Sequence, residues 1–237
     1  MNEHDAARYS PCSIYERALG PEAFAKLHPR IRERFGFMSS DRRASIGRGV
    51  MDVLWHGPPY TLPFLYIGTW RRIMFPEKGR DIPFKIENYA YVDRFGRETV
   101  TWVRTFETRK TRRFDATMIY SETRNRIVDY LGSHQHLAVD LHLEVCERGG
   151  IRITSGEQRF YEGIIGFRFP MFFSGVANVH EWFDDDRGQF GIEVDVRNPL
   201  WGRLFGYHGY FDAETLDEIG PEDIPEHVRP IREERRE

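Results

Sequence analysis

Apolar and polar residues alternate along most of this chain, starting near residue 45. The alternation is clearest over residues 137–145, where every second side chain is a Leu or Val and most of those between are polar. Side chains of a strand point to opposite faces in turn, so this period of two predicts strands with one core face and one solvent-facing side.

Ten segments follow this pattern and predict strands: residues 48–55, 84–92, 99–107, 113–121, 126–131, 137–145, 151–161, 178–184, 190–196 and 203–211. The connections are mostly of hairpin length and rich in turn residues, as in Asp93-Arg94-Phe95-Gly96. They leave no room for parallel crossovers. We therefore predict a mainly β chain, an antiparallel meander of about 9–10 strands that forms a barrel or a strongly curved sheet. A two-sheet sandwich is the main alternative.

Helices are expected only near the N-terminus. Ser13 and Glu16 have the spacing of a capping box, Gly20 is placed to end that helix, and Pro21 suits the start of a second. We expect a flexible segment over 1–12, a single β-rich domain over 13–213 with a helical cap at 13–35, and a charged, disordered tail over 214–237. Residues 60–75 fit either a short amphipathic helix or an irregular lid.

Composition narrows the classes of function. The chain has 237 residues, of which 40% are hydrophobic and 14% aromatic, with 34 basic and 37 acidic residues and a formal net charge of -3. The absence of a basic excess argues against nucleic-acid binding. Two distant cysteines, Cys12 and Cys146, favour free thiols. No apolar leader and no transmembrane run are present, so we expect a cytoplasmic protein.

Standard catalytic and cofactor motifs are absent, so the catalytic residues are unknown and no cofactor is expected. His134, His136, Asp140 and His142 share one parity on a continuous strand, which would suit a zinc or non-haem metal. The simpler interpretation is the solvent-facing side of that strand, and we expect no metal site.

Charged residues occur on faces that otherwise look apolar. Arg104 shares its parity with Trp102, and Glu157 and Arg159 share theirs with Ile153. A charge that faces a core is costly unless it is paired. These residues either form structural ion pairs or anchor the polar end of a ligand in a cavity.

Aromatic residues crowd two irregular segments, 60–75 and 164–176, the second of which contains Phe167 and Phe172. Core packing is the commonest role for such residues. Lining of an apolar pocket is a second interpretation, and contact with a membrane surface, supported by Arg71 and Arg72, is a third.

Several stretches together resemble a known bacterial family, the domain of unknown function DUF4166. They are Phe84-Lys85-Ile86-Glu87-Asn88-Tyr89, Arg113-Phe114-Asp115-Ala116-Thr117-Met118, Asp129-Tyr130-Leu131-Gly132, Gly156-Glu157-Gln158-Arg159-Phe160-Tyr161-Glu162-Gly163 and Asn198-Pro199-Leu200-Trp201-Gly202. The resemblance runs from about residue 13 to 211. It implies one shared architecture, and similar domains follow an NAD(P)-binding domain of the saccharopine dehydrogenase type. This chain lacks such a segment, and the family supplies no catalytic residues.

Three hypotheses on function follow. The first is a binding module for a small, largely apolar ligand, with ligand-binding residues Arg104, Glu157, Arg159, Trp102, Phe167 and Phe172. The second is an enzyme of unrecognised type, or an accessory domain that acts with a separate NAD(P)-dependent oxidoreductase. The third is a protein-interaction module.

Overall fold

A computed structural model describes residues 12–170 and 174–237, and most of them belong to a single sheet. Its strands in the described ranges are β1 (Ala44–His56), β2 (Gly79–Val92), β3 (Glu98–Glu107), β4 (Thr111–Ser121), β5 (Arg126–Leu131), β6 (Leu137–Val145), β7 (Ile151–Glu162), β8 (Ile165–Arg168), β9 (Val176–Asp184), β10 (Gln189–Asn198) and β11 (Gly202–Leu216). The prediction of a mainly β chain with short N-terminal helices is confirmed.

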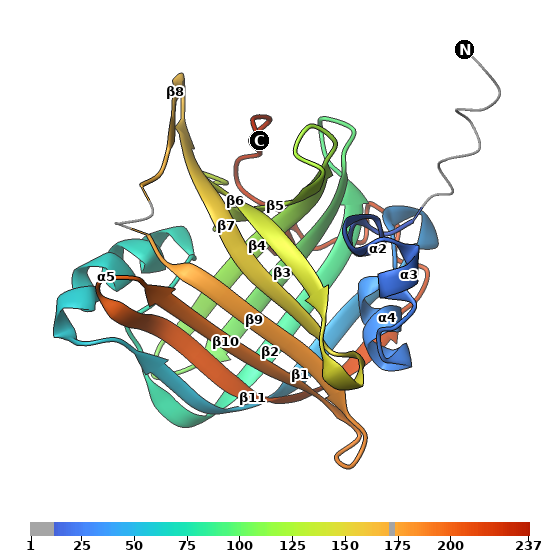
Figure 1. The fold of residues 1–237 in the computed structure, drawn as a ribbon, viewed down its shortest axis with the longest axis horizontal. Coiled ribbons are helices and arrows are strands. Elements are labelled where there is room, and N and C mark those ends of the chain that lie inside the picture. Colours follow the sequence, from blue (N-terminus) through green and yellow to red (C-terminus); the bar gives the residue numbers. More distant parts are fainter. Residues whose placement is uncertain (1–11, 171–173) are drawn as a thin grey trace.

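The sheet closes on itself as a barrel (Figure 1). Each strand from β1 to β7 pairs with the next, β7 pairs with β9, and β9, β10 and β11 follow in order. The last strand then pairs with the first, with Ala44 opposite Leu216, and all of these pairs are antiparallel. Strand β8 forms a hairpin with β7 outside the ring. Closure leaves no unpaired edge along the ring, which removes the liability of an open sheet.

A β-bulge interrupts the pairing of β6 with β7. Leu141 lies opposite Ser155 and Val139 lies opposite Gln158, so two residues of β7 face the single residue Asp140. An extra residue of this kind reverses which side of the sheet the following side chains occupy. Residues of β7 before and after the bulge therefore do not keep one parity.

Three short helices cover one end of the barrel: α2 (Ile14–Leu19), α3 (Pro21–Phe24) and α4 (Pro29–Phe35). The Ser13 hydroxyl accepts a hydrogen bond of 3.1 Å from the Glu16 amide, as the capping pattern predicts. Ile31 and Phe35 are fully buried, and the Phe35 ring meets the Trp102 ring edge-on at 5.6 Å. We call this the closed end.

A buried ion pair holds α4 to the barrel. The Arg34 Nε donates to a carboxylate oxygen of Glu181 on β9 at 2.5 Å, and its Nη1 donates to the Ser45 hydroxyl at 2.8 Å. The guanidinium also lies 5.0 Å from the centre of the Phe211 ring. Pairing compensates part of the cost of burying both charges.

Helix α5 (Leu62–Arg71) lies across the opposite end, within the link from β1 to β2. Of the two structures that the sequence allowed for residues 60–75, the helix is present. Its Gly68 packs closely on residue 74, since a Cβ there would lie 3.1 Å from the Met74 carbonyl oxygen. The turns from β3 to β4, β5 to β6, β7 to β8 and β10 to β11 lie at this same end.

The residues after β11 return along the barrel wall. Ile224 and Val228 are buried, the Ile231 amide donates to the Ser133 carbonyl at 2.7 Å, and the Tyr161 hydroxyl donates to the Glu237 carbonyl at 2.9 Å. The composition favoured a disordered tail, whereas here apolar burial and hydrogen bonds attach it to the barrel. Most of the N-terminal segment for which flexibility was expected lies outside the described residues. Both cysteines are free thiols.

No helix in the described ranges is long and apolar enough to cross a membrane.

Candidate functional site

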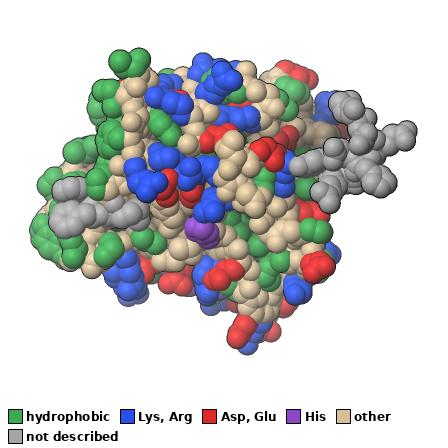
Figure 2. Space-filling view, turned by 45° about the horizontal axis from the view of Figure 1, so that its top comes forward, with side chains coloured by type: hydrophobic (Ala, Val, Ile, Leu, Met, Phe, Trp, Pro, Cys, Tyr) green, Lys and Arg blue, Asp and Glu red, His purple; other side chains and the backbone are tan. Residues whose placement is uncertain are grey.

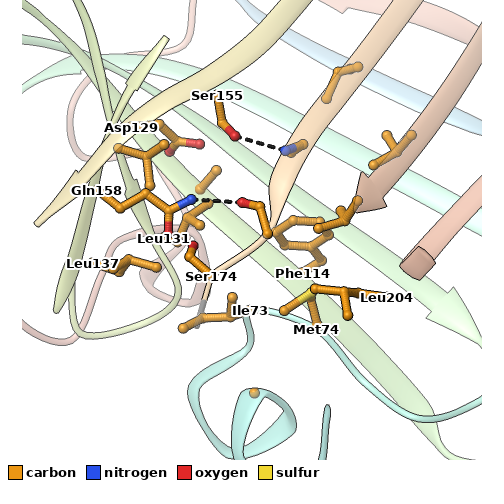
Figure 3. A pocket seen from close by; sticks show the side chains of 18 of the residues that line it. Ile73, Met74, Phe114, Asp129, Leu131, Leu137, Ser155, Gln158, Ser174 and Leu204 are labelled. Atoms are coloured by element: carbon orange, nitrogen blue, oxygen red, sulfur yellow. Dashed lines mark hydrogen bonds between the residues drawn. The ribbon is translucent and has the colours of Figure 1, made fainter. Parts of the chain in front are cut away.

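A cavity of about 270 Å³ occupies the barrel between its centre and the end that α5 covers (Figure 3). Inward side chains of most strands and residues of the α5 segment form its wall, which is predominantly apolar. Wall residues include Ile73, Met74, Phe114, Met118, Leu131, Leu137, Val139, Ile153, Val179, Val194, Val196 and Leu204.

The cavity exists because the barrel is wide and some inward positions carry small residues. Ten strands make an interior wider than side chains alone readily fill. Ala116, Gly175 and Ala177 line the cavity with little or no side chain. The N-terminal helices, in contrast, fill the closed end with Ile31 and Phe35.

Arg104 brings a positive charge into this apolar wall. Arg104 is 3% exposed. Its Nε donates to the Phe114 carbonyl at 3.2 Å, and its Nη1 donates to the Tyr207 hydroxyl at 3.4 Å. The guanidinium carbon lies 3.8 Å from the centre of the Phe114 ring. Among the described residues, no carboxylate lies within 4.0 Å of this guanidinium, so its charge has no direct counter-ion.

Asp129, on β5, is the carboxyl group of the cavity wall. Burial raises the pKa of Asp129 to about 7, although the Arg104 charge and hydrogen bonding to the Thr117 backbone act in the opposite direction. Its Oδ1 is buried and makes no hydrogen bond to the described residues. The site therefore holds an unpaired arginine and a carboxyl group that is partly neutral near pH 7.

Four further polar side chains line the cavity nearer α5. The Ser155 hydroxyl accepts from the Ala177 amide at 2.8 Å, and the Gln158 side chain donates to the Gly175 carbonyl at 2.7 Å (Figure 3). The Ser174 hydroxyl donates to the Gln158 side-chain oxygen, and Asn198 donates to the Ser174 carbonyl. These bonds tie the chain that enters β9 to β7 and β10.

Of the residues proposed from the sequence, Arg104 and Trp102 line the cavity together. Glu157 and Arg159 do not, because the bulge in β7 turns Gln158 inward and its two neighbours outward. The parity that grouped them with Ile153 holds only before the bulge.

The outward residues form an ion network on the barrel wall. Arg159 donates to Asp140 at 2.6 Å, and Arg124 donates to both Asp140 and Glu157, at 2.7 and 2.9 Å. Arg168 of β8 pairs with the second oxygen of Glu157 at 2.8 Å. This is the structural ion pairing that the sequence left open for these residues.

Of the two proposed phenylalanines, Phe167 is 47% exposed on β8 and packs between Phe160 and Phe169, with ring centres 5.4 and 6.3 Å away. Phe169, rather than Phe167, belongs to the cavity wall. Phe172 lies outside the described residues.

The histidines considered as metal ligands contact different groups. The His134 and His136 rings stack with centres 5.5 Å apart, and His136 Nδ1 lies 2.9 Å from both Arg232 and Glu162. His142 instead contacts Arg126 at 3.3 Å. Within 12–170 and 174–237, no three His, Cys, Asp or Glu side chains form a group that could hold a metal ion.

The sequence interpretation missed Asp129, although a signal was present. It alternates in step with Ile127 and Leu131 on a predicted strand, which is the same anomaly that singled out Arg104. Gln158 had no such signal, since its orientation depends on the bulge.

Comparison with known proteins identifies the family. The model of the "Domain of unknown function (DUF4166)" matches residues 27–211. The chain is also 36% identical over 208 residues to the "Uncharacterized protein YndH" of Bacillus subtilis (strain 168), covering 86% of this chain and 98% of that protein. No solved structure matches the chain. The resemblance noted in the sequence is thus confirmed, and the chain belongs to the DUF4166 family.

Proposed function

We propose that this protein binds a small, largely apolar molecule with an acidic group, inside the barrel. The observation that carries the proposal is the unpaired Arg104 in an apolar cavity of about 270 Å³. A volume near the lower end of the usual range for ligand sites, with few polar groups in an apolar wall, is typical of small-molecule pockets. The presence of the cavity favours ligand binding over a role in protein interaction alone, for which a solid interior would be sufficient.

The polar groups set the chemistry of the ligand. The Arg104 guanidinium can donate to an oxyanion in a charge-assisted hydrogen bond. Asp129, with a pKa raised to about 7, can donate a hydrogen bond to the same head group when neutral. Trp102 and Phe114 flank the guanidinium, with ring centres 5.6 and 3.8 Å from its central carbon. A carboxylate or similar oxyanion on an apolar body fits this combination.

One observation favours a second candidate, an enzyme. A carboxyl group with a pKa near 7 inside a cavity is suited to general acid–base catalysis. A product formed by the wild type and not by Asp129→Asn, with ligand binding retained, would support this candidate. A cytoplasmic setting, in which both free thiols would stay reduced, suits either function.

Isothermal titration calorimetry with decanoic acid, a fatty acid short enough for a cavity of this size, tests the binding proposal. Wild type should bind one probe per chain. Arg104→Met should weaken binding by roughly 10- to 100-fold, because a hydrogen bond to a charged group contributes about 1.5–3 kcal/mol. Ala177→Phe should block the cavity, whereas Ala213→Phe makes the same change at a half-buried position near the closed end and should leave binding unchanged.

Equal probe affinity in wild type, Arg104→Met and Ala177→Phe would contradict the proposal. Circular dichroism and thermal melting of each variant separate a lost site from a lost fold.

A further inference from the structure

Exposed apolar side chains gather around the end of the barrel that α5 covers. Of the thirteen large hydrophobic side chains exposed among the described residues, nine lie here: five within 60–70, three within 164–167, and Leu200. Ile67 is 65% exposed, Trp70 is 76% exposed, and Ile164, at the tip of the β7–β8 hairpin, is fully exposed. Figure 2 shows hydrophobic side chains along the edge of the molecule that carries α5 and β8. We call these nine side chains the apolar rim.

The rim borders the cavity mouth at α5. The Tyr60 hydroxyl donates to the Trp201 carbonyl at 2.9 Å, and the Phe64 and Trp201 rings meet edge-on at 5.2 Å. Phe64, Ile67 and Trp201 also line the cavity, so the rim and the cavity wall are continuous. An exposed apolar patch of this kind marks an interaction site.

The charged residues of the segments that carry the rim indicate which kind of partner binds there. Residues 57–76, 163–170 and 199–204 contain four arginines and no Asp or Glu, although the whole chain has 37 acidic residues. Three of these arginines pair with carboxylates outside the three segments: Arg72 with Asp115, Arg168 with Glu157, and Arg203 with Asp195.

The fourth arginine, Arg71, has no carboxylate within 4.0 Å among the described residues, and its guanidinium lies 4.3 Å from the centre of the Trp70 ring. Tryptophan beside a cationic residue, next to exposed aliphatic side chains, is the composition of segments that rest in the interface of an anionic bilayer.

We propose that the apolar rim docks on an anionic lipid surface, so that the barrel mouth faces the bilayer. Ile67, Trp70 and Ile164 enter the boundary between head groups and acyl chains, and Arg71 lies at the level of the phosphates. Docking rests on the exposed residues alone. A consequence is that the ligand passes from the bilayer into the cavity without crossing water. This consequence also rests on the proposed function.

Flotation of the full chain with two kinds of vesicle tests this inference: phosphatidylcholine alone, and equal parts of phosphatidylcholine and phosphatidylglycerol. Binding is expected to the second and to be much weaker to the first. Trp70→Ala and the pair Ile67→Ser with Ile164→Ser should each reduce binding by about tenfold or more, since affinity follows the apolar area buried. Arg71→Glu should reduce binding to the anionic vesicles.

Matched controls lie at the closed end. Val92→Ser replaces an exposed aliphatic side chain, and Arg187→Glu reverses an exposed charge in the turn from β9 to β10. Both should leave vesicle binding unchanged.

Three results would overturn the inference: no binding to anionic vesicles, equal losses in the rim and control variants, or self-association that the rim variants abolish without any vesicle binding. The last would make the rim an interface between copies of the chain. The solution titration with the fatty-acid probe uses no vesicles, so failure of docking and failure of ligand binding are distinguishable.

Discussion

The buried carboxyl group of Asp129 makes the stability of the empty protein depend on pH. Its pKa of about 7 in the folded chain compares with an ordinary aspartate value of 3.8. The folded state therefore holds this proton more tightly than the unfolded state does. The stabilising effect is fully present below pH 3.8 and is lost as pH rises through 7.

Asp129→Asn removes this proton and keeps the shape of the side chain. The gap between 3.8 and about 7 corresponds to about 4 kcal/mol in the free energy of unfolding. Relative to the variant, wild type should thus lose about 4 kcal/mol between pH 4 and pH 8, at up to about 1.4 kcal/mol per pH unit. Any pH-independent effect of the amide cancels in this comparison.

Urea unfolding of ligand-free protein at several pH values between 4 and 8 measures this difference directly. Val179→Thr, a change of similar shape at a wall position that carries no titratable group, is the control and should differ from wild type by a nearly constant amount. A constant difference between wild type and Asp129→Asn across the range would refute a buried, unpaired carboxyl group in the cavity wall.

Three further predictions concern stability. Glu181→Gln leaves the Arg34 charge buried without its partner and should lower the free energy of unfolding by about 3–5 kcal/mol in urea titration at pH 7; no loss would contradict the role of the pair. Gly132→Ala should lower the free energy of unfolding more than Gly96→Ala does in the same assay. Both residues have φ near +78°, but only at Gly132 would the new Cβ meet backbone, at 2.3 Å from the Arg71 carbonyl oxygen. A chain ending at Leu216 exposes the surface that Ile224 and Val228 cover and should melt roughly 10 °C lower by calorimetry; an unchanged melting temperature would mean that the tail adds no stability.

The sequence was sufficient for the ten strands of the ring because alternation is a local signal, whereas the short strand β8 was not predicted. Barrel closure was not predictable to the same degree, since it depends on pairing between β1 and β11, which are separated by most of the chain. The candidate site likewise contains residues that the sequence could place and residues that it could not. Arg104 and Trp102 could be placed by parity, because β3 pairs with β4 without a bulge.

Glu157 and Arg159 could not be placed by parity, because one extra residue in β7 reverses their direction and nothing in the sequence marks that bulge. Residues 60–75 were ambiguous for a related reason. Their apolar residues form no single stripe, since Leu65 is buried while its neighbours Phe64 and Tyr66 are exposed. The charged tail had the composition of a disordered segment, and only its long-range contacts with Ser133 and Tyr161 attach it to the barrel.

Native mass spectrometry of the protein purified from its own host tests the central claim most directly, because it asks whether a molecule occupies the barrel. We predict one small molecule per chain in wild type, extractable into organic solvent and carrying an acidic group. The same molecule should be absent from Ala177→Phe and present in Ala213→Phe. The bare chain mass in all three proteins, with no thermal shift across a panel of lipids and other apolar acids, would contradict the account.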